Sequence, residues 1–247
     1  MNNSQIIHFP ETESTNLSLR LLADAGTLAN KSMIWTDYQT NGRGQAGNSW
    51  ESAPGMNLLC SILFYLPHLP ANKSFTVLEL AALSVKYTLD KYAPDISIKW
   101  PNDIYFQDKK ISGILIENDI TNTFISRSII GIGINLNQTE FKSDAPNPIS
   151  LSMITGRKYV ISEVTKQFHF IFSQMSDILE SGLYAQLHQK YCTSLYHRDG
   201  FHNYQDANAC FEARIHHIEP SGYIILERCD NTLSRYGFKE VQTIINN

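Results

Sequence analysis

Residues 96–137 read ISIKWPNDIYFQDKKISGILIENDITNTFISRSIIGIGINLN, and their pattern predicts three consecutive strands. Alternation over residues 96–99 predicts a short strand that ends in a Trp-Pro-Asn-Asp turn, and residues 111–117 predict a second strand. Residues 124–134 predict a third β-rich segment, interrupted by Gly131 and Gly133, where a strand admits a close neighbour. These neighbouring strands predict a sheet at the centre of the fold.

The sequence on either side of this run adds helices and further strands. Ser14 and Thr15 are placed to cap a first helix and Gly26 to end it, while Ser74 is placed to cap a second. Helical spacing of apolar residues predicts helices over residues 14–25, 74–92, 162–179 and 184–191. Further strands are expected over residues 6–9, 33–36 and 57–64.

From about Leu195 onward, the sequence pattern changes from helical spacing to short strands. Short strands are expected over residues 210–216, 223–228 and 238–245, separated by Ser-Gly and Asp-Asn turns. These short strands predict a small C-terminal β-barrel. Because no linker composition precedes it, we expect the barrel to pack against the rest of the chain.

Composition excludes several classes of protein. A formal net charge of −4 and a pI near 6.0 argue against a nucleic-acid binder, which would carry a basic face. The most apolar stretch, residues 58–66, is shorter than the roughly 20 residues that a membrane-spanning helix needs. The four cysteines have no regular spacing and the first residues do not resemble a signal peptide, so we expect a cytoplasmic protein.

Residues 39–50 read QTNGRGQAGNSW and form a long polar loop. Gly42, Gly44 and Gly47 allow the backbone to approach a ligand, and Arg43 can bind phosphate or carboxylate oxygens with two hydrogen bonds. The combination favours a phosphate-bearing ligand. On glycine content alone, a flexible surface loop is the more common interpretation.

The Trp-Pro-Asn-Asp turn carries a second group of polar residues. Asn102 can present an amide and Asp103 a carboxylate at the end of a strand, and Lys110 follows in the stretch DKKISG. The alternative is that Lys109 and Lys110 form a solvated hairpin tip, as exposed lysines usually do.

The segment GIGIN at residues 131–135 places two glycines and Asn135 on one face of a strand. Asn135 could hydrogen-bond to the edge of a base. By itself this pattern is weak. It lacks the spacing of a dinucleotide-binding loop, and the chain has no P-loop motif.

Four motifs follow one another along the chain in an order that is specific to one protein family. ESTN at residues 13–16, GRGxxGxxW at 42–50, KWPND at 99–103 and GIGxN at 131–135 together resemble the catalytic domain of biotin protein ligases. The region around Tyr236 resembles the small SH3-like domain of the same family. The resemblance covers nearly the whole chain. It implies an α+β fold, with a mixed β-sheet flanked by helices as in class II aminoacyl-tRNA synthetases over residues 1–193 and an SH3-like β-barrel over 194–247.

The resemblance also implies an activity. Biotin protein ligases join biotin to ATP as biotinyl-AMP and transfer the biotin to a lysine of a biotin carboxyl carrier protein or domain. Magnesium is expected to arrive with ATP, held mainly by the phosphates. We expect a monomer or homodimer that binds neither nucleic acid nor membranes.

Matching motifs assign the biotin end of the site. Ser14, Thr15 and Gln39 are expected to bind the ureido group of biotin, with Asn16 beside them. Gly113 is expected on the wall of this pocket.

Matching motifs also assign the catalytic groups. Arg43 is expected at the biotin carboxylate and the ATP phosphates, and Lys110 at the carboxylate and the α-phosphate. Asp103 is expected to act on the acceptor lysine or on a metal ion. The remaining ligand-binding positions are loop and strand glycines and residues around the nucleotide, namely Gly42, Gly44, Trp50, Asn102, Gly133 and Asn135.

Two departures from the family pattern have consequences. The usual loop is GRGRRGR, but Gln45, Ala46 and Asn48 stand here where arginines are usual, so fewer cations would retain the adenylate. The larger ligases that are also repressors carry a winged helix before the catalytic domain. Because ESTN falls within the first 20 residues, we expect no such domain and no DNA binding.

Two other functions remain open at this point. A lipoate protein ligase shares the fold and the adenylation chemistry, and a non-catalytic biotin-binding module would bind biotin without consuming ATP. The histidine pairs 197/202 and 216/217 lack the spacing of zinc ligands, so no protein-built metal site is expected.

Overall fold

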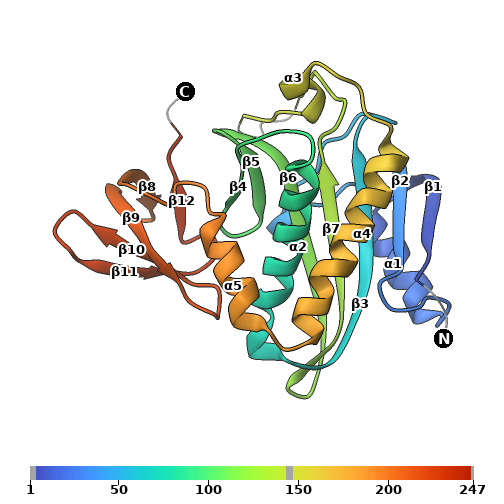
Figure 1. Ribbon diagram of the computed structural model, residues 1–247, viewed down its shortest axis with the longest axis horizontal. Helices are drawn as coiled ribbons and strands as arrows, with labels where there is room; N and C mark the ends of the chain where they lie inside the picture. The colour runs from blue at the N-terminus through green and yellow to red at the C-terminus, as the bar shows by residue number, and fades with distance from the viewer. Residues whose placement is uncertain (1–3, 143–146, 246–247) are drawn as a thin grey trace.

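The computed structural model describes residues 4–142 and 147–245, which form two sheets and five α-helices (Figure 1). The first sheet has the strand order β1-β2-β3-β7-β6-β5-β4, with bounds β1 Ile6–Thr12, β2 Met33–Gln39, β3 Leu58–Pro70, β4 Ile96–Lys99, β5 Asp103–Phe106, β6 Lys109–Thr121 and β7 Phe124–Ile134. The helices are α1 Thr15–Asp24, α2 Phe75–Leu89, α3 Leu151–Thr155, α4 Ile161–Glu180 and α5 Tyr184–Thr193. The second sheet has the order β11-β10-β9-β8-β12, with bounds β8 His202–Asp206, β9 Cys210–Ile218, β10 Ile224–Arg228, β11 Leu233–Tyr236 and β12 Val241–Thr243.

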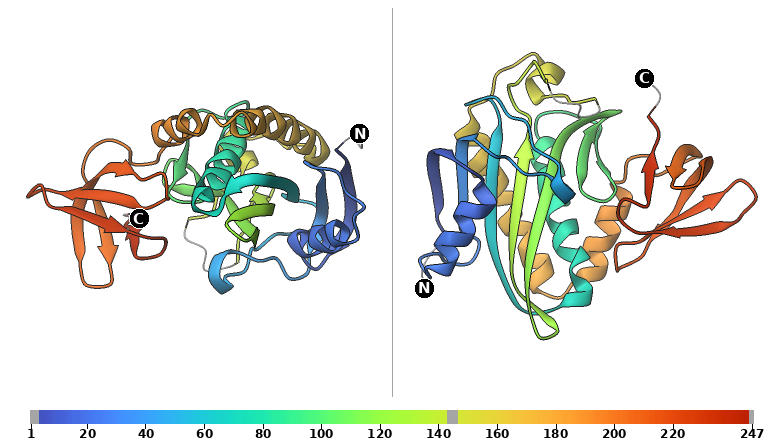
Figure 2. Two further views of the ribbon diagram at one scale, coloured as in Figure 1. Left: turned by 90° about the horizontal axis from the view of Figure 1, so that it is seen from below. Right: turned by 180° about the vertical axis from the view of Figure 1, so that it is seen from behind.

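The centre of the first sheet is apolar on both faces. Residues 58–64, LLCSILF, are buried throughout and pair with β7 in antiparallel register, while only β1 and β2 pair in parallel. Helices α2, α4 and α5 cover one face and α1 covers part of the other (Figures 1 and 2). A strand that carries apolar side chains on both sides needs such cover on both faces. None of the helices in the described part of the chain is long and apolar enough to cross a bilayer.

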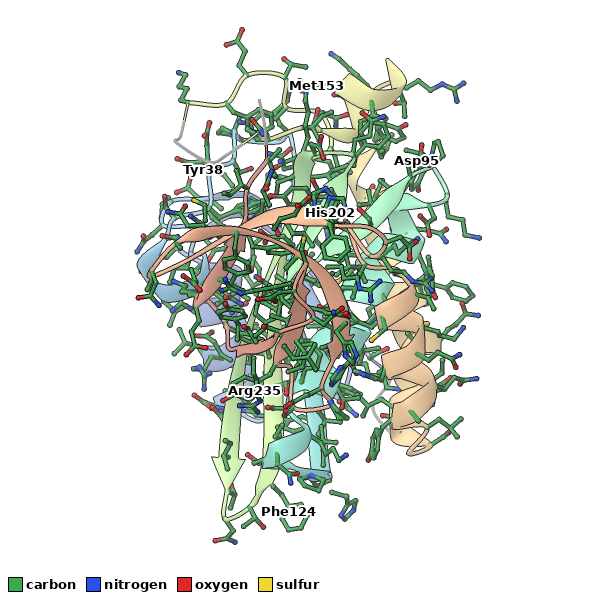
Figure 3. All side chains as sticks on the ribbon, turned by 90° about the vertical axis from the view of Figure 1, so that its left-hand side faces the viewer. Tyr38, Asp95, Phe124, Met153, His202 and Arg235 are labelled. Atoms are coloured by element: carbon green, nitrogen blue, oxygen red, sulfur yellow. The ribbon has the colours of Figure 1, made fainter. Side chains whose placement is uncertain are left out.

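The second sheet is strongly curved. Tyr236 of β11 donates a hydrogen bond to Asp206 of β8, although β10 and β9 lie between these strands in the sheet order. Three strand spacings of a flat sheet would be roughly 14 Å, so the sheet must curl to bring the two residues together. Figure 3 views the molecule from the side of this sheet, with His202 of β8 and Arg235 of β11 labelled.

Most of the expected elements are confirmed, and several bounds are wrong. Ser14 and Ser74 occupy the N-cap positions of α1 and α2, but neither side chain makes the capping hydrogen bond. The expected turn covers residues 100–103, and no strand was expected over residues 103–106, which form β5. Strands β8 and β11 and the short helix α3 were not expected either. The strand expected over 238–245 is present only as β12, Val241–Thr243, and a turn precedes it.

Polar side chains of the first part of the chain hold the second sheet by its backbone. His188 of α5 hydrogen-bonds to the carbonyl of Ile218 at 3.0 Å, and its other ring nitrogen lies 2.5 Å from the buried carboxylate of Glu79. The indole N–H of Trp100 donates to the carbonyl of Gly222 at 2.9 Å. Together these contacts fix the β9–β10 connection against α5 and the Trp-Pro-Asn-Asp turn.

The His188 contact predicts a specific dependence of stability on pH. Hydrogen bonds with Cys192 and Glu79 raise the pKa of His188 from 6.5 to about 10. Because the folded chain holds this proton more tightly, the stabilisation is full below pH 6.5 and is lost as the pH rises through about 10. His188→Gln should therefore lower the free energy of unfolding by roughly 1–3 kcal/mol near neutral pH.

Urea unfolding of the wild type and His188→Gln at several pH values checks this prediction. The difference between them should shrink steadily between pH 6.5 and 10. His68→Gln, which changes an exposed histidine, is the matched control. A difference that stays constant over this range would contradict the proposed proton linkage.

Candidate functional site

Two paired glycines form the floor of a small pocket in the first sheet. Gly113 of β6 lies opposite Gly133 of β7, and the indole of Trp50 lies on both. A Cβ atom built on Gly133 would be 2.3 Å from Trp50 Cε2, and one on Gly113 would be 2.9 Å from Cζ3. The indole therefore occupies space that exists because neither strand position carries a side chain.

The start of α1 forms the polar end of this pocket. Thr15 and Asn16 are buried, and the hydroxyl of Ser61 on β3 donates to Asn16 Oδ1 at 2.6 Å and lies 2.8 Å from Thr15 Oγ1. The backbone N–H of Thr15 donates to Gln39 Oε1 at 2.8 Å. The side chains at this end are thus held in fixed orientations before any ligand binds.

Asn16 is positioned from two further directions. Its amide nitrogen donates to Glu117 Oε2 at 2.8 Å, and its Oδ1 lies only 2.3 Å from where a Cβ of Gly131 would be. Gly131 is therefore required for the close approach of this amide. The pocket, with a volume of about 60 Å³, is bounded here by Leu115 and Gly131, which are opposite each other in the β6–β7 register.

Two cations line the small pocket, and each faces a carboxylate. Lys110 Nζ lies 2.7 Å from Asp103 Oδ1, and Arg43 Nη2 lies 3.4 Å from Glu117 Oε2. Lys110 Nζ also lies 5.8 Å from the centre of the Trp50 ring. Both ion pairs are partly exposed and so contribute little net stability. An entering anion can therefore replace the carboxylate as the partner of each cation.

A larger cavity of about 720 Å³ adjoins the small pocket. It extends from the glycine loop past the Trp-Pro-Asn-Asp turn to the second sheet, where Tyr204, Ile224 and Lys239 line it. The two cavities share six lining residues, namely Gly44, Gln45, Trp50, Asn102, Asp103 and Lys110. A ligand in the small pocket would therefore meet a ligand in the larger cavity at Lys110.

Two buried polar atoms at this site have no hydrogen-bond partner among the described residues. They are Nε1 of Trp50 and Oδ1 of Asn135, both on residues that line the larger cavity. A buried polar atom left without a partner costs roughly 1–3 kcal/mol, and such atoms are rare in native structures. One donor and one acceptor are thus available to a ligand with complementary groups.

The structure brings nearly all the residues assigned from the sequence to these two cavities. The small pocket contains Ser14, Thr15, Asn16, Gln39, Arg43, Gly44, Trp50, Asn102, Asp103, Lys110, Gly113 and Gly133, and the larger cavity adds Asn135. Gly42 does not line either cavity. It shapes the loop, because a Cβ there would lie 2.6 Å from the Trp50 carbonyl oxygen.

Four residues of the site were missed from the sequence. Ser61 is a polar residue inside the apolar run of β3, and Glu117 is an acidic residue at the end of the apolar pattern ISGILIE, so both carried a usable signal. Lys99 and Lys239 line the larger cavity; Lys99 is the first residue of the KWPND motif but was assigned no role, and Lys239 carried no signal. Their position depends on how the two sheets meet.

Solved structures of similar fold place this architecture in a known class. The biotin protein ligase of Aquifex aeolicus in complex with biotin and ATP matches with a TM-score of 0.79 and 23% identity, covering 99% of this chain and 100% of that one. The biotin protein ligase of Leishmania major in complex with biotinyl-5-AMP matches with a TM-score of 0.65 and 19% identity, covering 96% and 100%. The chain therefore has the biotin protein ligase fold.

Sequence comparison identifies the family. Residues 9–135 match the model of the biotin/lipoate A/B protein ligase family, and the chain belongs to that family. It is 32% identical over 136 residues to the bifunctional ligase/repressor BirA of Escherichia coli, covering 55% of this chain and 42% of that protein. It is 31% identical over 149 residues to the biotin–[acetyl-CoA-carboxylase] ligase of Mycobacterium tuberculosis, covering 57% and 52%. The chain thus matches about half the length of these relatives.

The contact between Trp50 and the glycine floor can be tested directly. Gly133→Ala should displace the indole, because the new methyl group would overlap the ring and the glycine loop can move more easily than a central strand. Tryptophan emission should shift to longer wavelength and become more accessible to iodide quenching. Of the three tryptophans, only Trp50 should account for the change, so the shift should vanish in a Trp50→Phe background. Unchanged emission in Gly133→Ala would contradict the packing described here.

Proposed function

We propose that this chain is a biotin protein ligase, which forms biotinyl-AMP from biotin and ATP and transfers biotin to a lysine of a biotin carboxyl carrier protein. Family membership and the names of its relatives support this function. The observation that carries the proposal is the junction at Lys110, where a small polar pocket opens into a cavity large enough for a nucleotide.

The first step joins the two substrates. An oxygen of the biotin carboxylate attacks the α-phosphorus of ATP, the bond to the β-phosphate oxygen breaks, and pyrophosphate leaves with its electron pair. Negative charge grows on the phosphate oxygens as the bond forms. Lys110 and Arg43, both lining the small pocket, are placed to stabilise that charge.

The polar end of the small pocket suits the ureido ring of biotin. A ureido group presents two N–H donors and one carbonyl acceptor, and Ser14, Thr15, Asn16 and Gln39 offer hydroxyl and amide groups of both kinds. The dithiolane ring of a lipoyl group has no N–H or carbonyl, so it offers these hydroxyl and amide groups no comparable hydrogen-bonding partner. The polar pocket therefore favours a biotin ligase over a lipoate ligase.

The larger cavity would hold the nucleotide. Trp50 and Asn135 supply the unpartnered donor and acceptor described above, and Asn102 lies beside them. The glycine loop, including Gly42 and Gly44, would fold over the adenylate and exclude water, which otherwise hydrolyses a mixed anhydride. Residues 1–193 would form this catalytic unit, closed on one side by residues 194–247.

Magnesium would enter as the complex with ATP. Mg²⁺ is commonly held by substrate phosphates and one or two carboxylates, and Asp103 and Glu51 line the larger cavity. Among residues 4–142 and 147–245, no group of three or more His, Cys, Asp or Glu side chains could hold a metal ion by itself. The ion would neutralise phosphate charge beside Asp103.

In the second step the acceptor amine opens the anhydride. The lysine nitrogen of the carrier attacks the biotinyl carbonyl carbon, AMP leaves, and the amine loses a proton. Asp103 lies where both cavities meet and could accept that proton directly or through water. We place this reaction in the cytoplasm, in a monomer or homodimer.

One assay tests the function as a whole. Purified protein is mixed with ATP, Mg²⁺, a biotin carrier domain and either biotin or lipoate, and acyl transfer is followed by streptavidin blotting for biotin and by mass for both. Biotinylation of the carrier lysine is expected. Lipoylation alone would indicate a lipoate ligase, and binding of biotin without pyrophosphate release would indicate a non-catalytic module.

The two cations are predicted to act on chemistry without affecting the fold. Arg43→Ala and Lys110→Ala should each slow biotin-dependent pyrophosphate release by about 10²–10³-fold, because each removes a donor from developing phosphate charge. Lys109→Ala, which changes the exposed neighbour of Lys110, is the matched control and should retain activity. Near-normal pyrophosphate release by either site variant would contradict the assignment.

The departure from the family loop pattern also has a measurable consequence. Gln45 lines both cavities, so Gln45→Arg would add a cation next to the adenylate. A charge-assisted hydrogen bond contributes roughly 1.5–3 kcal/mol, and 1.4 kcal/mol corresponds to tenfold. The half-time for release of labelled biotinyl-AMP should lengthen about tenfold or more, whereas Gln45→Met should not lengthen it. Equal half-times for Gln45→Arg and wild type would refute the idea that the missing arginines weaken retention.

A further inference from the structure

Lys99 is a partly buried cation on the wall of the larger cavity. It ends β4, and its ammonium group lies 5.3 Å from the centre of the Tyr105 ring. Within the described part of the chain it makes no ion pair at 4.0 Å or less, since the adjacent Asp103 is engaged by Lys110 at 2.7 Å. Burial lowers the pKa of Lys99, with a smaller opposing effect of Asp103 and a further lowering by Lys110.

A cation in such surroundings is unfavourable for the empty protein. Removing an ammonium group from water costs free energy that only a nearby anion or a set of hydrogen bonds can offset. The aromatic contact with Tyr105 offsets part of this cost. Because Lys99 faces a cavity, an anionic ligand in that cavity would supply the missing partner.

Lys239 lies on the same cavity but comes from the second sheet. It sits in the turn between β11 and β12, where its φ of +69° is uncommon for a residue with a side chain. The backbone N–H of Gly237 donates to the Glu240 carboxylate at 2.5 Å, which holds the turn closed.

An aromatic contact joins the two chain segments that carry these lysines on the cavity wall. Trp100, the neighbour of Lys99, packs edge-on against Phe238, the neighbour of Lys239, with ring centres 5.5 Å apart. The hydrogen bond from Trp100 to the Gly222 carbonyl fixes the second sheet at this point. The two cations therefore flank one packed contact between the sheets.

We propose that Lys99 and Lys239 form a subsite for the β- and γ-phosphates of ATP and for the pyrophosphate that leaves. This inference rests on the function proposed above. The reacting α-phosphate must meet the biotin carboxylate at Lys110, and Trp50 and Asn135 offer the hydrogen-bonding groups for the purine. The terminal phosphates then extend toward the cations contributed by β4 and by the second sheet.

The charges along the cavity agree with this placement. Its carboxylates already have partners, since Asp103 pairs with Lys110 and Glu51 accepts hydrogen bonds from the Lys142 backbone N–H and from Gln138. Lys99 and Lys239 make no ion pair with any described residue at 4.0 Å or less. The subsite is thus cationic, which suits a pyrophosphate group.

The test compares ligands that differ only in the terminal phosphates. Affinities of the full chain for ATP, AMP and inorganic pyrophosphate are measured by calorimetry for wild type, Lys99→Met, Lys239→Met and the control Lys109→Met. Each site variant should bind ATP and pyrophosphate about tenfold or more weakly and bind AMP and biotin as wild type does. Lys99→Arg should restore most of the pyrophosphate affinity.

The melting temperature of Lys99→Met distinguishes a phosphate-binding role of Lys99 from a structural one. Removing a partly buried charge with an isosteric neutral side chain should leave the melting temperature of Lys99→Met equal to or above that of wild type, even though ATP binding is weaker. Lys239 is exposed, so Lys239→Met changes no buried contact and keeps the test valid if Lys99→Met folds poorly.

The outcomes distinguish this inference from the proposed function. If the wild type makes biotinyl-AMP but both site variants keep the wild-type ratio of ATP to AMP affinity, the subsite is wrong and the ligase function stands. If the wild type binds pyrophosphate through these lysines but forms no biotinyl-AMP, the subsite stands and the ligase function fails.

Discussion

The paired glycines in the middle of the first sheet are the constraint on which the site depends. Gly113 and Gly133 face each other across β6 and β7, and the Trp50 indole lies on the surface that they leave open. A side chain at either position would overlap the indole, which lines both the small pocket and the larger cavity. Because strand register fixes which residues oppose each other, a one-residue slip of β6 against β7 would remove the opening altogether.

A second feature of the site is that the two cations of the small pocket, Lys110 and Arg43, each pair with a carboxylate in the empty protein. Lys110 is held by Asp103 and Arg43 by Glu117, at partly exposed positions where such pairs contribute little net stability. An entering anion can replace each carboxylate without leaving a buried charge unpaired. Lys99 differs, since its surroundings supply an aromatic ring and no carboxylate in direct contact. Its charge can be matched fully only by a ligand.

Much of the fold and of the site could be predicted from the sequence, because local motifs supply most of the site residues. Alternation and apolar runs predicted the central strands, and ESTN, GRGxxGxxW, KWPND and GIGxN predicted residues that line the two cavities. Strand β5 was missed because residues 103–106 follow a turn signal and are too short to show a period. Strands β8 and β11 are equally short, and polar residues dominate both. The sequence could not predict that Lys99 and Lys239 line one cavity, since they are 140 positions apart and their segments are joined by the packing of Trp100 on Phe238.

The way the two sheets are joined gives the second sheet a direct effect on the cavity. Trp100 and His188 bind backbone carbonyls of residues 222 and 218, so the attachment depends on the path of the β9–β10 connection more than on its side chains. Trp100 also begins the turn that carries Asn102 and Asp103 into both cavities.

Any ligand that contacts both walls must therefore favour the docked arrangement of the sheets. By reciprocity, the factor by which that ligand favours docking equals the factor by which the docked arrangement binds the ligand more tightly than the undocked one. The five-stranded sheet is in this sense a wall of the larger cavity, and its attachment and the binding of a ligand that contacts both walls are one coupled equilibrium.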